Sequence, residues 1–304
     1  MSTDERWRGL FVRDGQLRGL WRFLLFGVLF LALLRLESWF VPQPASVGMA
    51  GAIAWQGALM LLAAVVAGVV LLPTEDRPAG DLGFRWRRRT PRELGLGLAI
   101  GGGAIVVAVL LLAAAGQVRY AAEAGGAGAY VRTLIVGFVA LALPAAAEEA
   151  VFRGYPLQTL ARSVGPVTAT VMMSAAFAAA HAENPQVGPV ALLNIFLAGV
   201  MLSMAYLWSR SLWFTSAVHL GWNWTMALPL SLPVSGLRLF DTPLYQAVPR
   251  AGWLSGGAFG PEGGLAGTIG FLLAFWAVRR ATRGDRVVPE TSGEPDSTRR
   301  ENDE

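Results

Sequence analysis

Eight long apolar segments limit the folds open to this 304-residue chain more than any other feature of its sequence. A helix needs about 20 mostly apolar residues to cross the hydrocarbon core of a bilayer. Segments that approach this length occupy residues 19–36, 48–72, 94–115, 131–160, 166–183, 188–208, 211–230 and 263–279. Only 15% of the residues are charged, whereas soluble domains carry about 25%. We therefore expect an all-α, polytopic membrane bundle of about eight transmembrane helices.

The remaining polar sequence lies mostly at the two ends. Residues 1–18 are expected to form a cytoplasmic N-terminal segment, residues 19–283 a transmembrane helical domain, and the polar, Pro-containing residues 284–304 a disordered tail. Cysteine is absent from the sequence. Its absence excludes a disulfide framework, a thiolate nucleophile and a Cys-based metal site.

Arginine supplies all 25 basic residues, and its distribution predicts the topology. Most arginines lie in the N-terminal segment, in the connection 73–93 and after the fourth, sixth and eighth segments, all on one side of an eight-helix bundle. Because positively charged loops stay in the cytoplasm, we expect a multi-pass cell-membrane protein with both termini cytoplasmic. The arginines follow the helix ends, so the net charge of +4 indicates the lipid bilayer, and not nucleic acid, as the partner. A composition with abundant Ala, Gly and Leu but no Lys is typical of GC-rich bacterial genomes and favours a bacterial inner membrane.

A small set of polar side chains interrupts the apolar segments. Glu148, Glu149 and Arg153 lie in the fourth segment, and the two histidines of the chain, His181 and His219, lie in the fifth and seventh. Charges in a low dielectric are costly unless they are compensated or used. Glu149 and Arg153 are spaced i,i+4 and are expected to form an ion pair. Glu148 points about 100° away from Glu149 on the helical wheel, so it is free to face His181 and the seventh segment.

Height along the helices brings the same groups together. Measured from the centre of the expected turn between the fourth and fifth segments, Glu148 lies about 16 residues before it and His181 about 17 after it, so both are expected at one depth of a helical hairpin. His219 and Asn223 share a helix face because they are four residues apart, and Phe177 and His181 do so for the same reason. The fifth segment ends soon after His181, so counting places the site towards the outer end of the bundle.

Other residues indicate how the helices pack. Pro144 lies inside the fourth segment and predicts a kink. Gly199 and Ser203 of the sixth segment allow a neighbouring helix to approach closely, and Asn194 is expected to link helices. The Pro- and Gly-rich connection 229–262 is expected to fold over the outer face.

The clustered polar groups suit the hydrolysis of a peptide bond. A carboxylate among apolar residues can act as a general base for water, a role we assign to Glu148. His219 and Asn223 are placed to donate hydrogen bonds to the tetrahedral oxyanion, and His181 to hold the water or shuttle a proton. Glu148, His181 and His219 also match the ligand number of a catalytic divalent metal such as zinc, but the sequence has no HExxH motif. The residues alone therefore leave the cofactor open between none and one metal ion.

Three ordered motifs resemble those of a known family. The stretches "EEAVFR", "FAAAH" and "HLGWN" resemble the EExxxR, FxxxH and HxxxN/D motifs of the CPBP family, the CAAX-protease and bacteriocin-processing (Abi) intramembrane endopeptidases. The resemblance covers about residues 131–230 and implies a helical membrane fold with its site inside the bilayer. It implies catalytic roles for Glu148, His181, His219 and Asn223, and supporting roles for Glu149, Arg153 and Phe177.

The resemblance implies an endopeptidase of glutamate or metal type whose substrate is a membrane-embedded peptide or protein. Prenylated CAAX proteins are not expected in a bacterium, so that substrate is not carried over. The same residues also fit a transporter or proton relay, or a non-catalytic membrane scaffold such as an immunity protein. Ion flux without peptide cleavage would favour the first alternative. A deletion phenotype that the Glu148→Ala variant fully rescues would favour the second.

Overall fold

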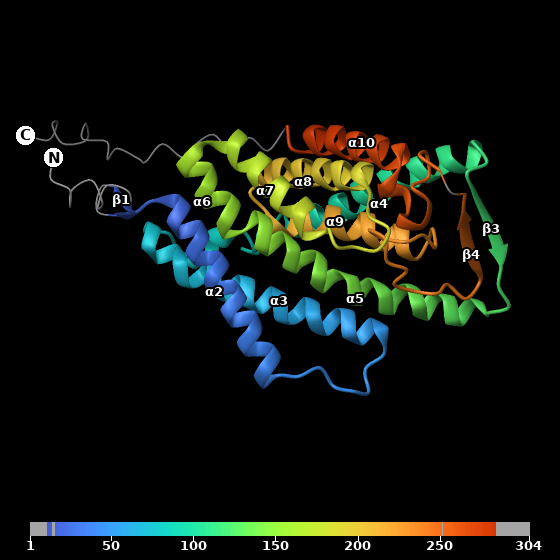
Figure 1. Cartoon of the computed structure of the whole chain (residues 1–304), viewed down its shortest axis with the longest axis horizontal. Coiled ribbons are helices and arrows are strands. Elements are labelled where there is room, and N and C mark those ends of the chain that lie inside the picture. The colour runs from blue at the N-terminus through green and yellow to red at the C-terminus, as the bar shows by residue number, and fades with distance from the viewer. Residues whose placement is uncertain (1–10, 14–15, 251, 284–304) are drawn as a thin grey trace, which may run out of the picture.

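A computed structural model describes residues 11–13, 16–250 and 252–283 of the chain. The predicted N-terminal segment 1–18 lies largely outside these residues, and the predicted tail 284–304 lies wholly outside them. The described residues are mostly helical (Figure 1). The α-helices are α2 (Gly19–Phe40), α3 (Met49–Leu71), α4 (Thr90–Ala114), α5 (Ala127–Arg153), α6 (Tyr155–Val164), α7 (Pro166–Ala180), α8 (Pro189–Ser209), α9 (Leu212–Ala227) and α10 (Leu265–Ala281).

Each of the eight predicted segments contains an observed helix, which confirms the polytopic helical bundle. Five helical stretches are long and apolar enough to cross a membrane by length and composition: Gly19–Phe40, Met49–Glu75, Thr90–Ala114, Ala127–Val164 and Pro189–Ser209. Helices α7, α9 and α10 are shorter, with 15, 16 and 17 residues. The chain therefore combines helices that are long enough to span a membrane with helices that are shorter than this length.

The fourth predicted segment is not one helix, as expected, but two. The backbone leaves the helical conformation at Gly154 (φ −69°, ψ −128°), which separates α5 from α6. Pro156, at the second position of α6, has no backbone N–H and is suited to the first turn of a new helix. A Cβ atom on residue 154 would lie 2.3 Å from the Ala150 carbonyl oxygen, so the break depends on glycine.

Glycines allow the central helices to approach each other closely. Helix α4 packs along α9, and an added Cβ on Gly101 of α4 would lie 2.0 Å from the carbonyl oxygen of Val218 in α9. The reciprocal contact is made by Gly221, whose Cβ would lie 2.5 Å from the Leu98 carbonyl oxygen. The predicted close approach at Gly199 is also present, because a Cβ there would lie 2.9 Å from Cβ of Ser174 in α7. Small residues thus set the spacing of α4, α7, α8 and α9.

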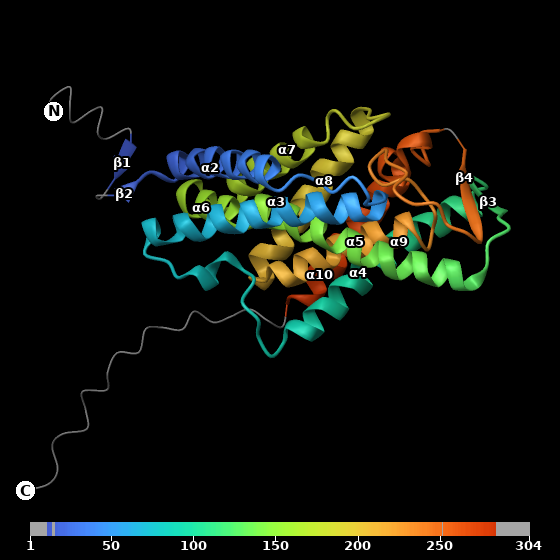
Figure 2. The same cartoon turned by 90° about the horizontal axis from the view of Figure 1, so that it is seen from below.

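The remaining helices flank this centre. Figure 1 and Figure 2 show α3 running beside α5, with α2 and α3 on one side of the bundle and α10 on the other. Phe214, Val218 and Trp222 of α9 lie in a buried apolar cluster with Ile105 of α4 and Phe271 of α10. Helix α9 is therefore surrounded by other elements, which is why a 16-residue helix can carry polar side chains at this depth.

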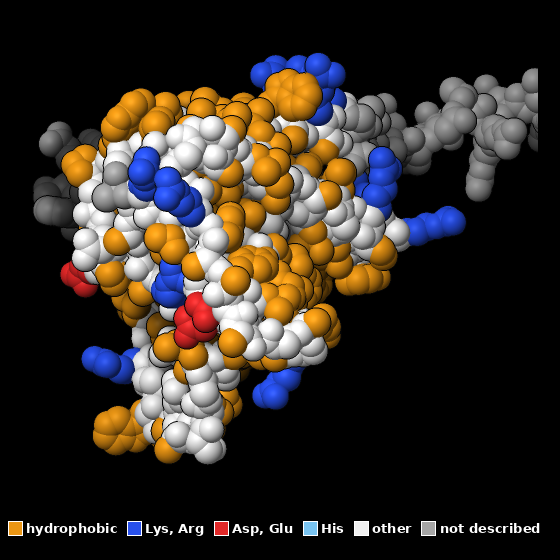
Figure 3. Space-filling model, turned by 90° about the vertical axis from the view of Figure 1, so that its right-hand side faces the viewer, with side chains coloured by type: hydrophobic (Ala, Val, Ile, Leu, Met, Phe, Trp, Pro, Cys, Tyr) orange, Lys and Arg blue, Asp and Glu red, His pale blue; other side chains and the backbone are white. Residues whose placement is uncertain are grey.

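A two-stranded sheet closes one end of the bundle, and the sequence patterns did not predict it. Strands β3 (Val118–Ala122) and β4 (Tyr245–Pro249) pair antiparallel across a long sequence separation. We call this end the Arg-poor end; it comprises β3, β4 and the connections 181–188 and 228–264. The opposite, Arg-rich end comprises the connection 72–89, α6 and the α8–α9 junction at Arg210. Figure 3 looks onto the Arg-poor end, where charged side chains are scattered among apolar ones.

Candidate active site

The paired carboxylates of α5 have different surroundings. Glu149 is fully buried and accepts a hydrogen bond from Nη1 of Arg153 at 3.0 Å, so the predicted i,i+4 ion pair is present. Nη2 of Arg153 donates to the Gly199 carbonyl oxygen of α8 at 3.2 Å, and its guanidinium lies 4.5 Å from the centre of the Phe177 ring. The ion pair therefore joins α5 to both α7 and α8.

His219 lies between the two carboxylates. Its Nδ1 donates to Oε1 of Glu149 at 2.9 Å, and its Nε2 lies 3.8 Å from Oε2 of Glu148. Sequence reasoning paired Glu149 with Arg153 alone and left the contacts of Glu149 with α9 unpredicted. The structure gives Glu149 a second role, because it fixes the orientation of the His219 ring and leaves Nε2 directed at Glu148.

Glu148 is the more accessible of the pair. Its side chain is 25% exposed, whereas the side chain of Glu149 is fully buried. Within the described residues, Oε2 of Glu148 has no hydrogen-bond partner. An unpaired carboxylate oxygen at this depth is costly, so it is an acceptor that a water molecule or a substrate can satisfy.

Phe177 and His181 contribute the α7 side of the site. His181 follows the last residue of α7, and its Nδ1 donates to the Phe177 carbonyl oxygen at 2.8 Å, which leaves Nε2 free of that bond. The Phe177 ring lies 4.7 Å from the His181 ring and 6.2 Å from the His219 ring, measured between centroids. The predicted shared face of Phe177 and His181 is present, and Phe177 contacts both imidazoles.

A cavity of about 750 Å³ brings the four predicted catalytic residues together. Glu148, His181, His219 and Asn223 all line it, and so does Phe177. Its apolar wall comes from side chains of α2, α3, α5, α8 and α9: Phe30, Leu34, Met49, Ile53, Met60, Leu141, Val151, Ile195, Met201, Leu202 and Val218. The cavity therefore offers a few polar groups within a large apolar surface.

The lining of the cavity reaches exposed residues at the Arg-poor end, and we call this part of it the mouth. Asn184 in the connection after α7 lines it, as do Ser235 and the exposed residues Leu237 and Arg238 in the connection after α9. Nδ2 of Asn184 donates to the Ser235 carbonyl oxygen at 2.9 Å, which ties these two connections together. Counting residues along the fifth segment predicted a site towards this end. The cavity that holds Glu148 and His181 is lined by residues of this end, which agrees with that prediction.

Glu262 is a cavity residue that the sequence analysis did not single out. Its carboxylate accepts hydrogen bonds from Nε1 of Trp222 at 3.0 Å and from the backbone N–H and hydroxyl of Ser235 at 2.7 and 2.8 Å. Its carbonyl oxygen accepts from Nδ2 of Asn194, which also donates to the Gly264 carbonyl oxygen. Asn194 thus links α8 to the connection before α10. The sequence feature that could have identified Glu262 is its position as a lone acidic residue in the Gly-rich stretch "GPEGG".

The predicted metal ligands do not assemble into a metal site. Among the described residues, no group of three or more His, Cys, Asp or Glu side chains has an arrangement that would hold a metal ion. Nδ1 of each histidine is engaged, by a carbonyl oxygen for His181 and by Glu149 for His219, and such bonds leave Nε2 available. Because no group of three such ligands is present among the described residues, we derive no chemical step through a metal. The Ser174 hydroxyl, which lies in the same helix as Phe177, donates its hydrogen bond to the Thr170 carbonyl oxygen and not to a histidine.

The fold and the site are those of a multi-pass helical membrane protein with a carboxylate–imidazole cluster in a cavity of the bundle. Residues 130–225 match the family model described as Rce1-like, type II CAAX prenyl endopeptidase Rce1-like. This match confirms the resemblance to the CAAX-protease (CPBP) family over about a third of the chain, and it indicates a membrane protease. The predicted catalytic and supporting residues all lie within the matched segment. No curated protein and no solved structure matches the chain.

Proposed function

We propose that the chain is an intramembrane endopeptidase in which Glu148 activates the attacking water. One observation carries this proposal: a Glu148 carboxylate oxygen without a hydrogen-bond partner among the described residues lies 3.8 Å from an imidazole nitrogen, and the partly exposed Glu148 side chain lines a mostly apolar cavity. A general base must reach the water it deprotonates, and a site inside the bundle limits the competing bulk water.

The reaction needs no group beyond this chain's own side chains and one water molecule. Glu148 removes a proton from the water, and the resulting hydroxide attacks the carbonyl carbon of the scissile bond. The C–N bond then breaks as the amide nitrogen receives the proton held by Glu148. General acid–base catalysis of this kind contributes about 10²–10⁴-fold in rate.

Asn223 and His219 act on the developing oxyanion, and His181 acts on the water. Asn223 lies one helical turn from His219 and lines the same cavity, so its amide can donate to a substrate oxygen. Protonated on both nitrogens, His219 donates Nε2–H to the oxyanion while Glu149 holds Nδ1–H. His181 presents Nε2 to the cavity and positions the water.

The substrate is a membrane-embedded peptide or protein in an extended, largely apolar conformation. A cavity of about 750 Å³ walled by leucine, isoleucine, methionine and phenylalanine side chains favours apolar residues on both sides of the scissile bond. Arg238 lines the mouth and favours an acidic or terminal carboxylate group beyond the apolar stretch.

The distribution of arginine supports an orientation with both termini in the cytoplasm of a bacterial cell. In this orientation the Arg-poor end faces away from the cytoplasm. The mouth formed by Asn184, Ser235 and Arg238 then receives substrates from the outer side of the membrane.

The test is cleavage by the purified protein in liposomes, offered a mixture of apolar peptides whose new N-termini are identified by mass spectrometry. Glu148→Gln keeps the size of the side chain and is expected to abolish cleavage. The matched Glu123→Gln variant, at an exposed glutamate outside the cavity, is expected to retain it. Full activity of Glu148→Gln would contradict the proposal. Ion flux in the same liposomes without cleavage would favour a transporter.

A further inference from the structure

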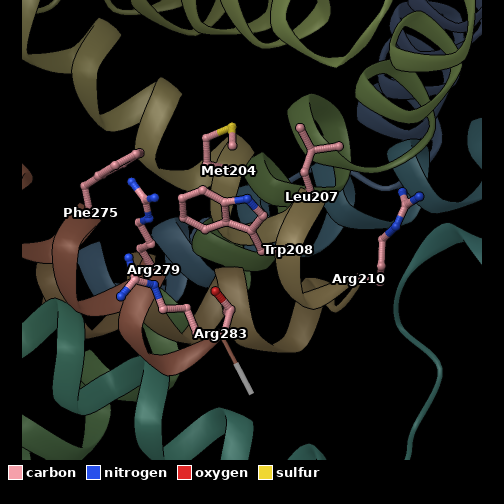
Figure 4. Close-up of a pocket in the computed structure, with 8 residues that line it drawn as sticks. Met204, Leu207, Trp208, Arg210, Phe275, Arg279 and Arg283 are labelled. Carbon is pink, nitrogen blue, oxygen red and sulfur yellow. The ribbon is translucent and has the colours of Figure 1, made fainter. Parts of the chain in front are cut away.

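A second cavity lies at the Arg-rich end, away from the candidate active site. It has a volume of about 610 Å³ and lies between the last turns of α8 and α10. Its lining is made of Met204, Leu207, Trp208, Arg210, Phe275, Arg279, Thr282 and Arg283. Figure 4 shows the Trp208 indole in the middle of this group, with Arg279 on one side and Arg210 on the other. None of these residues lines the cavity that holds Glu148.

The three arginines of this cavity differ from other arginines at the same end. Glu75 makes ion pairs with Arg22, Arg77 and Arg162, and Glu93 makes one with Arg89. No acidic side chain of the described residues lines the second cavity. Arg210, Arg279 and Arg283 are all exposed, and they make no ion pair with another described residue. Three positive charges around one cavity therefore lack a counter-charge within the described part of the chain.

The rest of the lining is apolar and aromatic. The rings of Trp208 and Phe275 lie 5.5 Å apart at an interplanar angle of 61°, and Met204 and Leu207 extend the same surface. Next to it, Arg280 lies 4.9 Å above the ring of the exposed Trp276. Tryptophan and arginine at helix ends are typical of the level of the lipid headgroups. The cavity therefore presents guanidinium groups beside an apolar surface at the level where phosphates meet acyl chains.

We propose that this cavity binds one anionic phospholipid, with its phosphate held by Arg279 and Arg283, an acyl chain packed on Trp208 and Phe275, and Arg210 adding a positive charge on the far side of Trp208. Guanidinium groups bind phosphate oxygens through paired N–H donors, which suits this headgroup better than a single ammonium would. Basic pockets between helices at the cytoplasmic side are suited to anionic headgroups. The proposal is independent of the proteolytic function, because it uses none of the candidate catalytic residues.

The test is native mass spectrometry of the full chain in detergent, titrated with phosphatidylglycerol or with phosphatidylcholine of the same acyl chains. One phosphatidylglycerol is expected to remain bound in preference to phosphatidylcholine. The substitutions Arg279→Gln and Arg283→Gln are each expected to weaken binding about five-fold, and Arg210→Gln, on the far side of Trp208, to weaken it less. Arg279→Lys keeps the charge and is expected to recover part of the affinity. A matched pair, Arg88→Gln and Arg92→Gln, removes exposed charges at the same end outside the cavity and is expected to leave affinity unchanged.

Three outcomes would overturn the proposal. Equal losses in the matched pair would mean that the charge of this end, and not the cavity, attracts lipid. Complete displacement of phosphatidylglycerol by inorganic phosphate would make the cavity a site for soluble anions. Lipid binding that appears only after deletion of the acidic residues 284–304 would make that segment the occupant. Size-exclusion profiles and helical content, measured for every variant, identify any that fail to fold, and the Arg279→Lys variant then carries the comparison.

Discussion

Nδ1 of His219 lies 2.9 Å from Oε1 of Glu149, which places a buried carboxylate behind the imidazole that faces Glu148. The same carboxylate oxygen accepts from Arg153 at 3.0 Å. One glutamate of the adjacent pair thus organises the site, and the other is accessible from the cavity. Adjacent like charges are compatible with this depth because Arg153 and His219 both bond to Glu149.

Glu149 and Arg153 are expected to be coupled in stability. Glu149→Ala leaves the fully buried Arg153 without its ion-pair partner, and Arg153→Ala leaves the fully buried Glu149 with only its bond to His219, so each is expected to cost about 3–5 kcal/mol. The double variant is expected to lose clearly less than the sum of the two single variants. Unfolding of the purified proteins in one detergent measures this coupling. Strictly additive losses would contradict it.

Substitutions of Asn223 and Asn194 are expected to separate catalysis from stability. Asn223→Ala removes a donor from the cavity and is expected to lower kcat about 10²–10³-fold with little loss of stability. Asn194→Ala leaves the carbonyl oxygens of Glu262 and Gly264 without their donor and is expected to cost about 1–3 kcal/mol. Cleavage rates and unfolding of both variants, measured side by side, check this contrast. A stable, fully active Asn223→Ala variant would remove Asn223 from the mechanism.

The spacing of α4 and α9 is expected to be sensitive to one methyl group. A Cβ at residue 101 would lie 2.0 Å from the Val218 carbonyl oxygen, so Gly101→Ala must separate the two helices, at a cost of about 1–3 kcal/mol. Because Val218 precedes His219, activity is expected to fall as well. The control is Gly103→Ala, where an added Cβ meets no atom within 4 Å and helix propensity favours alanine. Equal stability of the two variants would contradict the contact.

The absence of cysteine from the sequence makes the orientation directly testable. The Glu123→Cys variant places a thiol at the Arg-poor end, and the Arg88→Cys variant places one at the Arg-rich end; both positions are exposed. With cytoplasmic termini, a membrane-impermeant maleimide is expected to label the first variant in intact spheroplasts and the second only in inverted vesicles. The reverse pattern would turn the mouth of the cavity towards the cytoplasm.

Local patterns in the sequence predicted what depends on local geometry. Apolar segments of spanning length predicted the bundle, and i,i+4 spacing predicted the contacts of Glu149 with Arg153 and of Phe177 with His181. Counting along the helical hairpin placed Glu148 and His181 at one depth, i,i+4 spacing placed His219 and Asn223 on one face, and all four residues line one cavity. Their catalytic roles remain a proposal.

The missed features depend on contacts between distant segments. The bond between Glu149 and His219 requires the rotation of α5 relative to α9, which spacing within either helix does not specify. The pairing of β3 with β4 joins residues more than a hundred positions apart, and Glu262 reaches the cavity only because Trp222 and Ser235 bind it. The break at Gly154 was missed because apolar residues continue on both sides of it.

Gly57 allows α3 to pack directly against the backbone of α5 beside the active-site cavity. It lines the cavity with Pro144 of α5, and an added Cβ on residue 57 would lie 2.5 Å from the Pro144 nitrogen. One turn further along α5 lies Glu148. Any side chain at residue 57 would therefore press on the backbone of α5 one turn before Glu148, so this glycine determines how closely α3 can approach the segment that carries the paired carboxylates.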